Sequence, residues 1–149
     1  MSKKKRKLTI RNGFWRLELR SYKELDAWKQ SMELTKSIYE ITVTFPAREV
    51  YGLASQMQRA AVSVPSNIAE GSGRNYKKEF VQFLYLSRGS LLELETQIEL
   101  SKMLKYIDET RYKELAELTN RVHKIINGLI FSLKRSPTTN NPQPTTSEG

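Results

Sequence analysis

Few side chains in this sequence could carry out catalysis. His123 is the only histidine, and the chain has no cysteine. No acidic residue lies three or four positions from His123, so no carboxylate of the same helix face would orient the imidazole. We therefore interpret His123 as a partly exposed helix residue rather than as a general base or a metal ligand.

Glu95 and Glu99 are spaced one helical turn apart and could in principle hold a cation. Hard cations need further oxygen ligands, and ferritin-like sites need Glu-x-x-His pairs, of which this sequence has none. We interpret the two glutamates as ion-pair partners or as part of a solvated face. The sequence predicts no metal site and no cofactor.

Ser63, Ser66 and Ser72 could be considered as nucleophiles, but a chain with one histidine offers little basis for a catalytic triad. Gly71-x-Gly73 could suggest a phosphate loop. However, no predicted strand precedes it and no Gly-Lys-Ser/Thr follows, so we interpret it as a helix stop. The sequence predicts no catalytic residues and a protein that is not an enzyme.

Polar residues in predicted close-packed helices need partners. We expect a structural polar network that fixes the registry of the bundle, formed by Asn67, Glu70, Arg88 and Glu95. Arg59, Arg74 and Arg88 are the candidate partners of Glu70 and Glu95. An alternative is that Arg59 and Arg74 join two lysines, Lys77 and Lys78, in a basic patch that contacts phosphates.

The net charge of +9 is concentrated at the amino terminus. Residues 1–20 carry eight Lys or Arg and one acidic residue, whereas residues 21–135 carry seventeen and fourteen. A cationic arm on a bundle of nearly balanced charge is expected to meet a polyanion, which would be nucleic acid or an acidic protein surface. A solubilising tail is the simpler alternative.

Nucleic acid would contact basic residues on the arm, near the second predicted loop and towards the end of the last helix. These candidates are Lys3, Lys4, Lys5, Arg6, Lys7, Arg11, Arg16, Arg59, Arg74, Lys77, Lys78, Arg121, Lys124, Lys134 and Arg135. Phe14, Tyr22 and Tyr76 lie beside some of them and could stack on bases. No base-reading module is evident, so phosphate contacts would dominate.

The length of 149 residues fits one domain, and the absence of cysteine excludes disulfides. The basic run Lys3–Lys7 is not followed by the apolar stretch of a signal peptide, and no segment has the length and apolarity of a membrane span. We therefore expect a cytoplasmic protein without a membrane partner.

We predict three segments. Residues 1–20 form a basic arm with a β-hairpin around Asn12-Gly13, which would place Ile10 opposite Trp15 and Leu8 opposite Leu17. Residues 21–135 form the bundle, and residues 136–149 lack an apolar anchor and form a disordered tail.

Four amphipathic segments with short connections predict an all-α, up-down-up-down four-helix bundle for residues 21–135. The first helix would begin at a Ser21-x-x-Glu24 capping box and end before Pro46, and the second would run from about residue 48 to about residue 71 with a kink at Pro65. Asn75 would cap the third helix, and Asp108 or Thr110 the fourth. The apolar positions expected at helical spacing include Met32 on the first helix and Leu104 on the third.

The segment AAVSVPSNIAEGSGR at residues 60–74, preceded by Tyr51-Gly52-Leu53 and by SQMQR at residues 55–59, resembles a known hallmark sequence. It is similar to that of the bacterial four-helix bundle proteins encoded in intervening sequences of 23S ribosomal RNA genes. Residues 25–28, 78–80, 89–97 and 127–130 extend the resemblance across the bundle, while the arm lies outside it. More distantly, that family resembles the accessory variability determinant proteins that assist reverse transcriptases in diversity-generating retroelements.

The resemblance implies a homopentamer, since similar proteins form five-membered rings. Our functional hypothesis is a non-enzymatic, oligomeric scaffold that binds RNA or DNA. The resemblance makes it a candidate accessory subunit of a reverse transcriptase, or a protein associated with an rRNA intervening sequence. The alternative is a protein-interaction scaffold that docks an acidic partner without nucleic acid.

Overall fold

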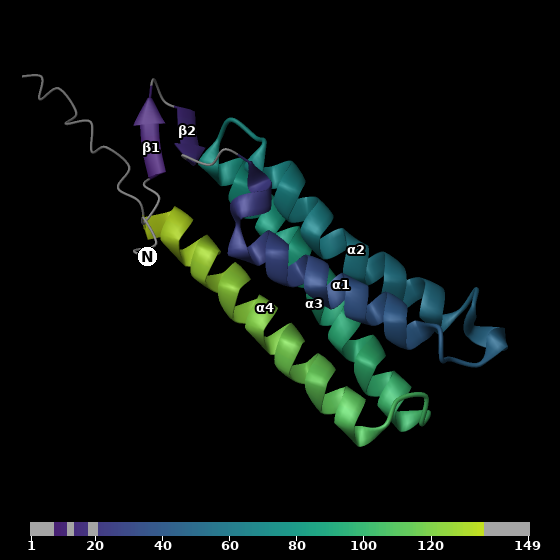
Figure 1. Cartoon of the computed structure of the whole chain (residues 1–149). Coiled ribbons are helices and arrows are strands. Elements are labelled where there is room, and N and C mark those ends of the chain that lie inside the picture. The colour runs from purple at the N-terminus through teal and green to yellow at the C-terminus, as the bar shows by residue number, and fades with distance from the viewer. Residues whose placement is uncertain (1–7, 12–13, 18–20, 136–149) are drawn as a thin grey trace, which may run out of the picture.

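The computed structural model describes residues 8–11, 14–17 and 21–135, with side chains for residues 21–135. The predicted four-helix bundle is confirmed. Its helices are α1 (Asp26–Thr42), α2 (Leu53–Ser72), α3 (Lys77–Met103) and α4 (Glu109–Arg135). Two short 3-10 helices, η1 (Tyr22–Glu24) and η2 (Ala47–Glu49), precede α1 and α2. Figure 1 shows the four long helices packed side by side.

Two strands precede the bundle, β1 (Leu8–Arg11) and β2 (Phe14–Leu17). They pair antiparallel, with Leu8 opposite Leu17 and Ile10 opposite Trp15. Three predicted features lie outside the described residues: the basic run Lys3–Lys7, the Asn12-Gly13 turn and the tail at residues 136–149.

Each helix contributes fully buried apolar side chains at three- and four-residue spacing, which is why the sequence folds as a bundle. The core is built on Leu34, Ile38, Met57, Val64, Ile68, Phe80, Leu84, Leu91, Leu94, Val122, Ile126 and Leu133. Burying one such side chain stabilises the fold by roughly 1.5–3 kcal/mol. The prediction that Met32 and Leu104 belong to this core is wrong, because both side chains are exposed.

The starts of three helices differ from the predicted ones. Ser21 caps the 3-10 helix η1 through Lys23 N, and α1 begins only at Asp26, without a side-chain cap. The segment around Arg48 forms η2, so α2 starts at Leu53. Tyr76, not Asn75, precedes α3. Asp108 does cap α4, since its Oδ1 accepts from Arg111 N at 2.8 Å.

Pro65 lies inside α2, which continues unbroken from Leu53 to Ser72. A proline has no N–H, so the carbonyl of Ala61 four residues earlier lacks its helical donor. The buried hydroxyl of Thr35 on α1 donates to this carbonyl at 3.0 Å. The neighbouring helix therefore satisfies the acceptor that the proline leaves open. The kink predicted at Pro65 stays a prediction.

Small residues let α2 and α3 approach closely. Ser87 Oγ of α3 donates to Val64 O at 2.9 Å, and the hydroxyls of Ser63 and Ser90 lie 2.8 Å apart. Gly71 faces α3 so closely that an added Cβ would lie 2.5 Å from the Cβ of Phe83. The helix stop predicted at Gly71-x-Gly73 is confirmed, since α2 ends at Ser72 with Gly73 as its C-cap, while Gly71 is a buried residue within α2 that the close packing requires.

Glu49 of η2 caps the start of α2. Its Oε2 accepts from Leu53 N at 2.9 Å, and its Oε1 accepts from Tyr106 Oη at 3.0 Å. The Leu53 N–H holds the pKa of Glu49 below the ordinary 4.5, and the Tyr106 hydroxyl lowers it further; desolvation opposes this shift, and Arg48 adds the smallest lowering effect. The ionised carboxylate is thus favoured in the folded state.

We expect Glu49 to make stability depend on pH in the acid range. A carboxyl group whose pKa is lowered by folding stabilises the protein above its unfolded pKa near 4.5, and this contribution is lost as the pH falls through the lower folded pKa. In urea titrations at stepped pH, Glu49→Gln should lose less stability over this window than the wild type. Glu33→Gln, at an exposed position on α1, is the matched control and should follow the wild type. Identical curves for Glu49→Gln and the wild type would contradict the assignment.

Candidate nucleic-acid interface

Basic residues gather at one end of the bundle. Figure 1 shows the start of α1, the α2–α3 connection and the last turn of α4 at this end. Five of the predicted contact residues lie there, and we call them the basic end: Arg74, Lys77, Lys78, Lys134 and Arg135. The arm precedes α1 in the sequence, so the chain enters the bundle at the basic end.

The α2–α3 part of the basic end is held by local contacts. Arg74 donates to Glu70 Oε1 at 3.0 Å, and its guanidinium lies 4.9 Å from the ring centre of Phe83. Lys77 is partly withdrawn from water, and this burial lowers the pKa of its ammonium group. Lys78 is exposed.

The α4 part of the basic end rests on aromatic rings. Lys134 Nζ donates to Tyr85 Oη of α3 and lies 4.9 Å from the centre of that ring. Arg135 lies 4.9 Å from the ring centre of Phe131, one turn earlier on α4. These contacts position two cationic groups at the surface, where they can meet an anionic ligand.

Three other predicted contacts lie away from this end. Arg59 is exposed on α2, fifteen residues before Arg74, and at 1.5 Å per residue this separates the two by about 20 Å. The alternative patch that included Arg59 is therefore not assembled. Arg121 and Lys124 are exposed on α4, roughly 15–20 Å before its end. Arg11 and Arg16 belong to β1 and β2, and their side chains lie outside the described residues.

The four residues expected to form one polar network make separate contacts instead. Asn67 bonds within α2 to Ser63, and Glu70 pairs with Arg74 on the surface. Arg88 donates to Asn127 Oδ1 of α4 at 3.1 Å. Glu95 lies beside His123. The expected single network is therefore wrong, and two of its members, Arg88 and Glu95, link α3 to α4.

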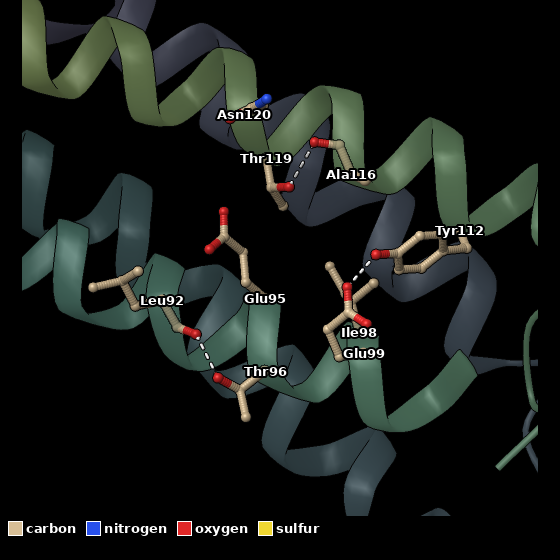
Figure 2. A pocket seen from close by; sticks show the side chains of 9 residues that line it. All are labelled: Leu92, Glu95, Thr96, Ile98, Glu99, Tyr112, Ala116, Thr119 and Asn120. Atoms are coloured by element: carbon tan, nitrogen blue, oxygen red, sulfur yellow. Dashed lines mark hydrogen bonds between the residues drawn. The ribbon is translucent and has the colours of Figure 1, made fainter. Parts of the chain in front are cut away.

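A pocket of about 450 Å³ opens between α3 and α4. Figure 2 shows Glu95 pointing from α3 towards Thr119 of α4, while Tyr112 donates to Glu99. This hydrogen bond is the main cause that raises the pKa of Tyr112, and desolvation adds to it. Among the described residues, no three acidic or histidine side chains converge in a way that could hold a metal ion.

His123 has a partner that sequence spacing did not show. Its Nε2 lies 2.9 Å from Glu95 Oε1, with 16% of the His123 side chain and 35% of the Glu95 side chain exposed. The ring N–H does not point closely enough at that oxygen to form a hydrogen bond. The contact is therefore an ion pair when the imidazole is protonated. Local spacing missed it because the two residues are on different helices.

Sequence reasoning also missed three residues of the surface near the basic end: Tyr85, Asn127 and Phe131. Helical spacing could have pointed to two of them, Tyr85 and Phe131. Tyr85 precedes Arg88 by three residues and Phe131 precedes Arg135 by four, which are the separations that bring side chains together on a helix. The contact of Lys134 with Tyr85 needed the packing of α3 against α4.

A four-helix bundle with a basic end defines a structural class, and comparison with known proteins identifies the family. The family model for the 23S rRNA-intervening sequence protein matches residues 23–128. The chain therefore belongs to this family. Within the described residues, no helix combines the length and apolarity that crossing a membrane requires.

Among solved structures, the chain is similar to a protein with unknown function from the S23 ribosomal protein family of Bacteroides thetaiotaomicron VPI-5482. The TM-score is 0.63 at 20% sequence identity, and the match covers 70% of this chain and 97% of the other. At that identity, the similarity supports the fold alone. The search among curated proteins gave no significant match.

Proposed function

We propose that this protein is a non-enzymatic, oligomeric scaffold in the cytoplasm that binds RNA or DNA through its arm and its basic end. The observation that carries the proposal is the position of the basic end. Lysines and arginines that are far apart in the sequence lie at the end of the bundle where the arm enters. A polyanion lying across this end would contact both sets of charges, and each phosphate contact adds to a salt-dependent affinity.

The bundle order that we propose is up-down-up-down, with the β1–β2 hairpin as an extension of the arm. Two contacts between α3 and α4 support this order for that pair of helices. Glu95 meets His123, and Lys102, later on α3, meets Glu109, earlier on α4. Contacts that run in reverse along the two helices are those of antiparallel neighbours.

We further propose that the scaffold is a homopentamer. The outer face of α3 supports an oligomer because it exposes four large apolar side chains: Leu86, Leu92, Leu100 and Met103. Gly89 lies within α3, and a Cβ added there would meet no atom within 4 Å. A glycine inside a helix costs about 0.5–1 kcal/mol relative to alanine. Close approach of a second chain would account for it.

The role as a reverse-transcriptase accessory, or in association with an rRNA intervening sequence, rests on the family membership and the more distant resemblance. The second candidate function is a scaffold that docks an acidic protein without nucleic acid. The exposed apolar face of α3 favours it, because apolar side chains beside charged ones are typical of protein interfaces.

The test is binding of the full chain to a structured RNA and to duplex DNA between about 50 and about 200 mM salt, followed by fluorescence anisotropy. We expect tight binding whose logarithm falls steeply with the logarithm of salt concentration. Exchanging Lys3, Lys4, Lys5, Arg6 and Lys7 for glutamine should weaken it and reduce the slope by about 0.7–0.9 for each phosphate that is no longer neutralised.

Lys113→Gln is the matched control, because Lys113 is exposed near the start of α4, at the opposite end of the bundle. It should leave the slope unchanged. Light scattering on the same samples should give five times the chain mass of 17.3 kDa. Absence of binding at the lowest salt concentration would overturn the nucleic-acid function and leave the acidic protein partner, to be tested by the same charge substitutions.

A further inference from the structure

Tyr85 of α3 lies between two cations. The guanidinium of Arg88 is 4.8 Å from the centre of its ring, and Lys134 Nζ of α4 is 4.9 Å from it. Lys134 also donates to the Tyr85 hydroxyl. The quadrupole of the ring face attracts the Arg88 guanidinium and the hydroxyl accepts from Lys134, so Tyr85 holds both side chains at defined positions.

Phe131 lies beside this group on α4. Asn127, one turn before it, accepts from Arg88 at 3.1 Å, and Lys134, almost one turn after it, bonds to Tyr85. Phe131 therefore occupies the stretch of α4 between two contacts with α3. Its side chain is 59% exposed, and Arg135 lies 4.9 Å from its ring centre. We call this surface the aromatic platform: Tyr85, Arg88, Asn127, Phe131, Lys134 and Arg135.

The charges of the aromatic platform are not neutralised within the described part of the chain. There, neither Arg88, Lys134 nor Arg135 has a carboxylate at ion-pair distance. At the other end of the same two helices two cations are paired, Lys102 with Glu109 at 3.4 Å and Arg111 with Glu114 at 3.0 Å. Two uncompensated cations at Tyr85 and a third at the exposed ring of Phe131 complement an anion that carries aromatic groups.

We propose that the aromatic platform binds a single-stranded segment of nucleic acid, with phosphates on Arg88, Lys134 and Arg135 and a base stacked on Phe131. This inference rests on the proposed function and specifies its ligand. In a duplex the faces of the bases are covered by their neighbours, so only an unpaired base can stack on a surface side chain. Tyr85 is the positioning residue, because its ring and hydroxyl hold the cations.

The decisive variant is Phe131→Leu in the full chain. It keeps an apolar side chain at an exposed position and removes the π-face. We expect its affinity for an unstructured single strand of about 12 nucleotides to fall on the order of tenfold, because base stacking on a ring contributes that much or more. The salt slope should stay unchanged, since no cation is removed. Phe131→Trp should restore binding.

A second variant with Arg88→Gln and Lys134→Gln separates charge from stacking. We expect it to reduce the salt slope for the single strand by about 0.7 for each phosphate that the protein no longer neutralises. The matched control for Phe131→Leu is Tyr39→Leu, which removes an exposed aromatic ring from α1. It should change neither the affinity nor the salt slope. The probes are oligo-uridine, oligo-thymidine of the same length, and an RNA duplex. Comparing the first two probes shows whether the bound strand is RNA or DNA.

Loss of affinity in Phe131→Leu for either single strand, with duplex binding unchanged, supports the aromatic platform. Equal affinities of Phe131→Leu and the wild type for both single strands would overturn it, as would an equal loss on the duplex. In that case the proposed function still stands if the glutamine exchange at residues 3–7 weakens binding. If the wild type binds none of the three probes at the lowest salt concentration, the proposed function fails as well.

Discussion

Replacing Gly71 by alanine is expected to lower the free energy of unfolding by about 1–3 kcal/mol, the usual range for an overpacked core. The added Cβ would lie 2.5 Å from Phe83 Cβ and 2.8 Å from Phe80 Cδ2. Phe83 Cβ is fixed to the backbone of α3, and Phe80 is fully buried. Relief therefore requires α2 and α3 to separate. The gain of about 0.5–1 kcal/mol from replacing a helical glycine is the smaller effect.

Gly128→Ala is the matched control for this expected result. Gly128 lies within α4, and a Cβ there would meet no atom within 4 Å. We expect this exchange to raise the free energy of unfolding by about 0.5–1 kcal/mol, because only the helical preference changes. Both variants should be measured by urea denaturation at one protein concentration, since assembly makes stability depend on concentration. A Gly71→Ala variant as stable as Gly128→Ala would contradict the close approach of α2 and α3.

Thr35→Val is expected to cost about 1–3 kcal/mol, because it leaves the buried carbonyl of Ala61 without a donor. The valine has nearly the same shape, so packing changes little. Thr119→Val is the matched control. Thr119 is also buried, but its hydroxyl donates only within α4, to the carbonyls of Leu115 and Ala116. Those carbonyls keep their ordinary helical N–H donors, so we expect the smaller cost.

A double-mutant cycle with Pro65→Ala tests the cause. Alanine at position 65 restores an N–H that can donate to Ala61 O within α2, so Thr35 is no longer needed there. In the Pro65→Ala background, the cost of Thr35→Val should fall to that of Thr119→Val. Equal costs of Thr35→Val in both backgrounds, again from urea denaturation, would show that the hydroxyl does not compensate for the proline.

Much of the fold was predictable because helical periodicity is a local property. Apolar residues at three- and four-residue spacing indicated four helices, and positions of that spacing on α2, such as Met57, Val64 and Ile68, are buried in the structure. Helix starts were less predictable. Ser21 has the sequence form of a cap for α1, but the chain makes a separate 3-10 turn there before Leu25 enters the core.

The basic residues of the candidate site could be named from the sequence, but their positions relative to one another could not. The charge of the sequence indicated a polyanion partner, and Lys134 and Arg135 were among the expected contacts. That Arg59 is remote from Arg74 follows from the length of α2, which runs unbroken through Pro65, where the sequence predicted a kink. His123 and Glu95 are on two different helices and far apart in the sequence, so no local spacing could pair them.

The sequence by itself determined the four helices, the apolar stripes, the family and the concentration of positive charge, because these depend on composition and on short-range spacing. Only the tertiary structure decided which residues meet across helices. In the tertiary structure Thr35 donates to the Ala61 carbonyl that Pro65 leaves without a donor, and Gly71 lies against α3. Tyr85 contacts the cations Arg88 and Lys134. The physical reason is that the register between two packed helices is set by all their side chains together, and no single stretch of sequence contains it.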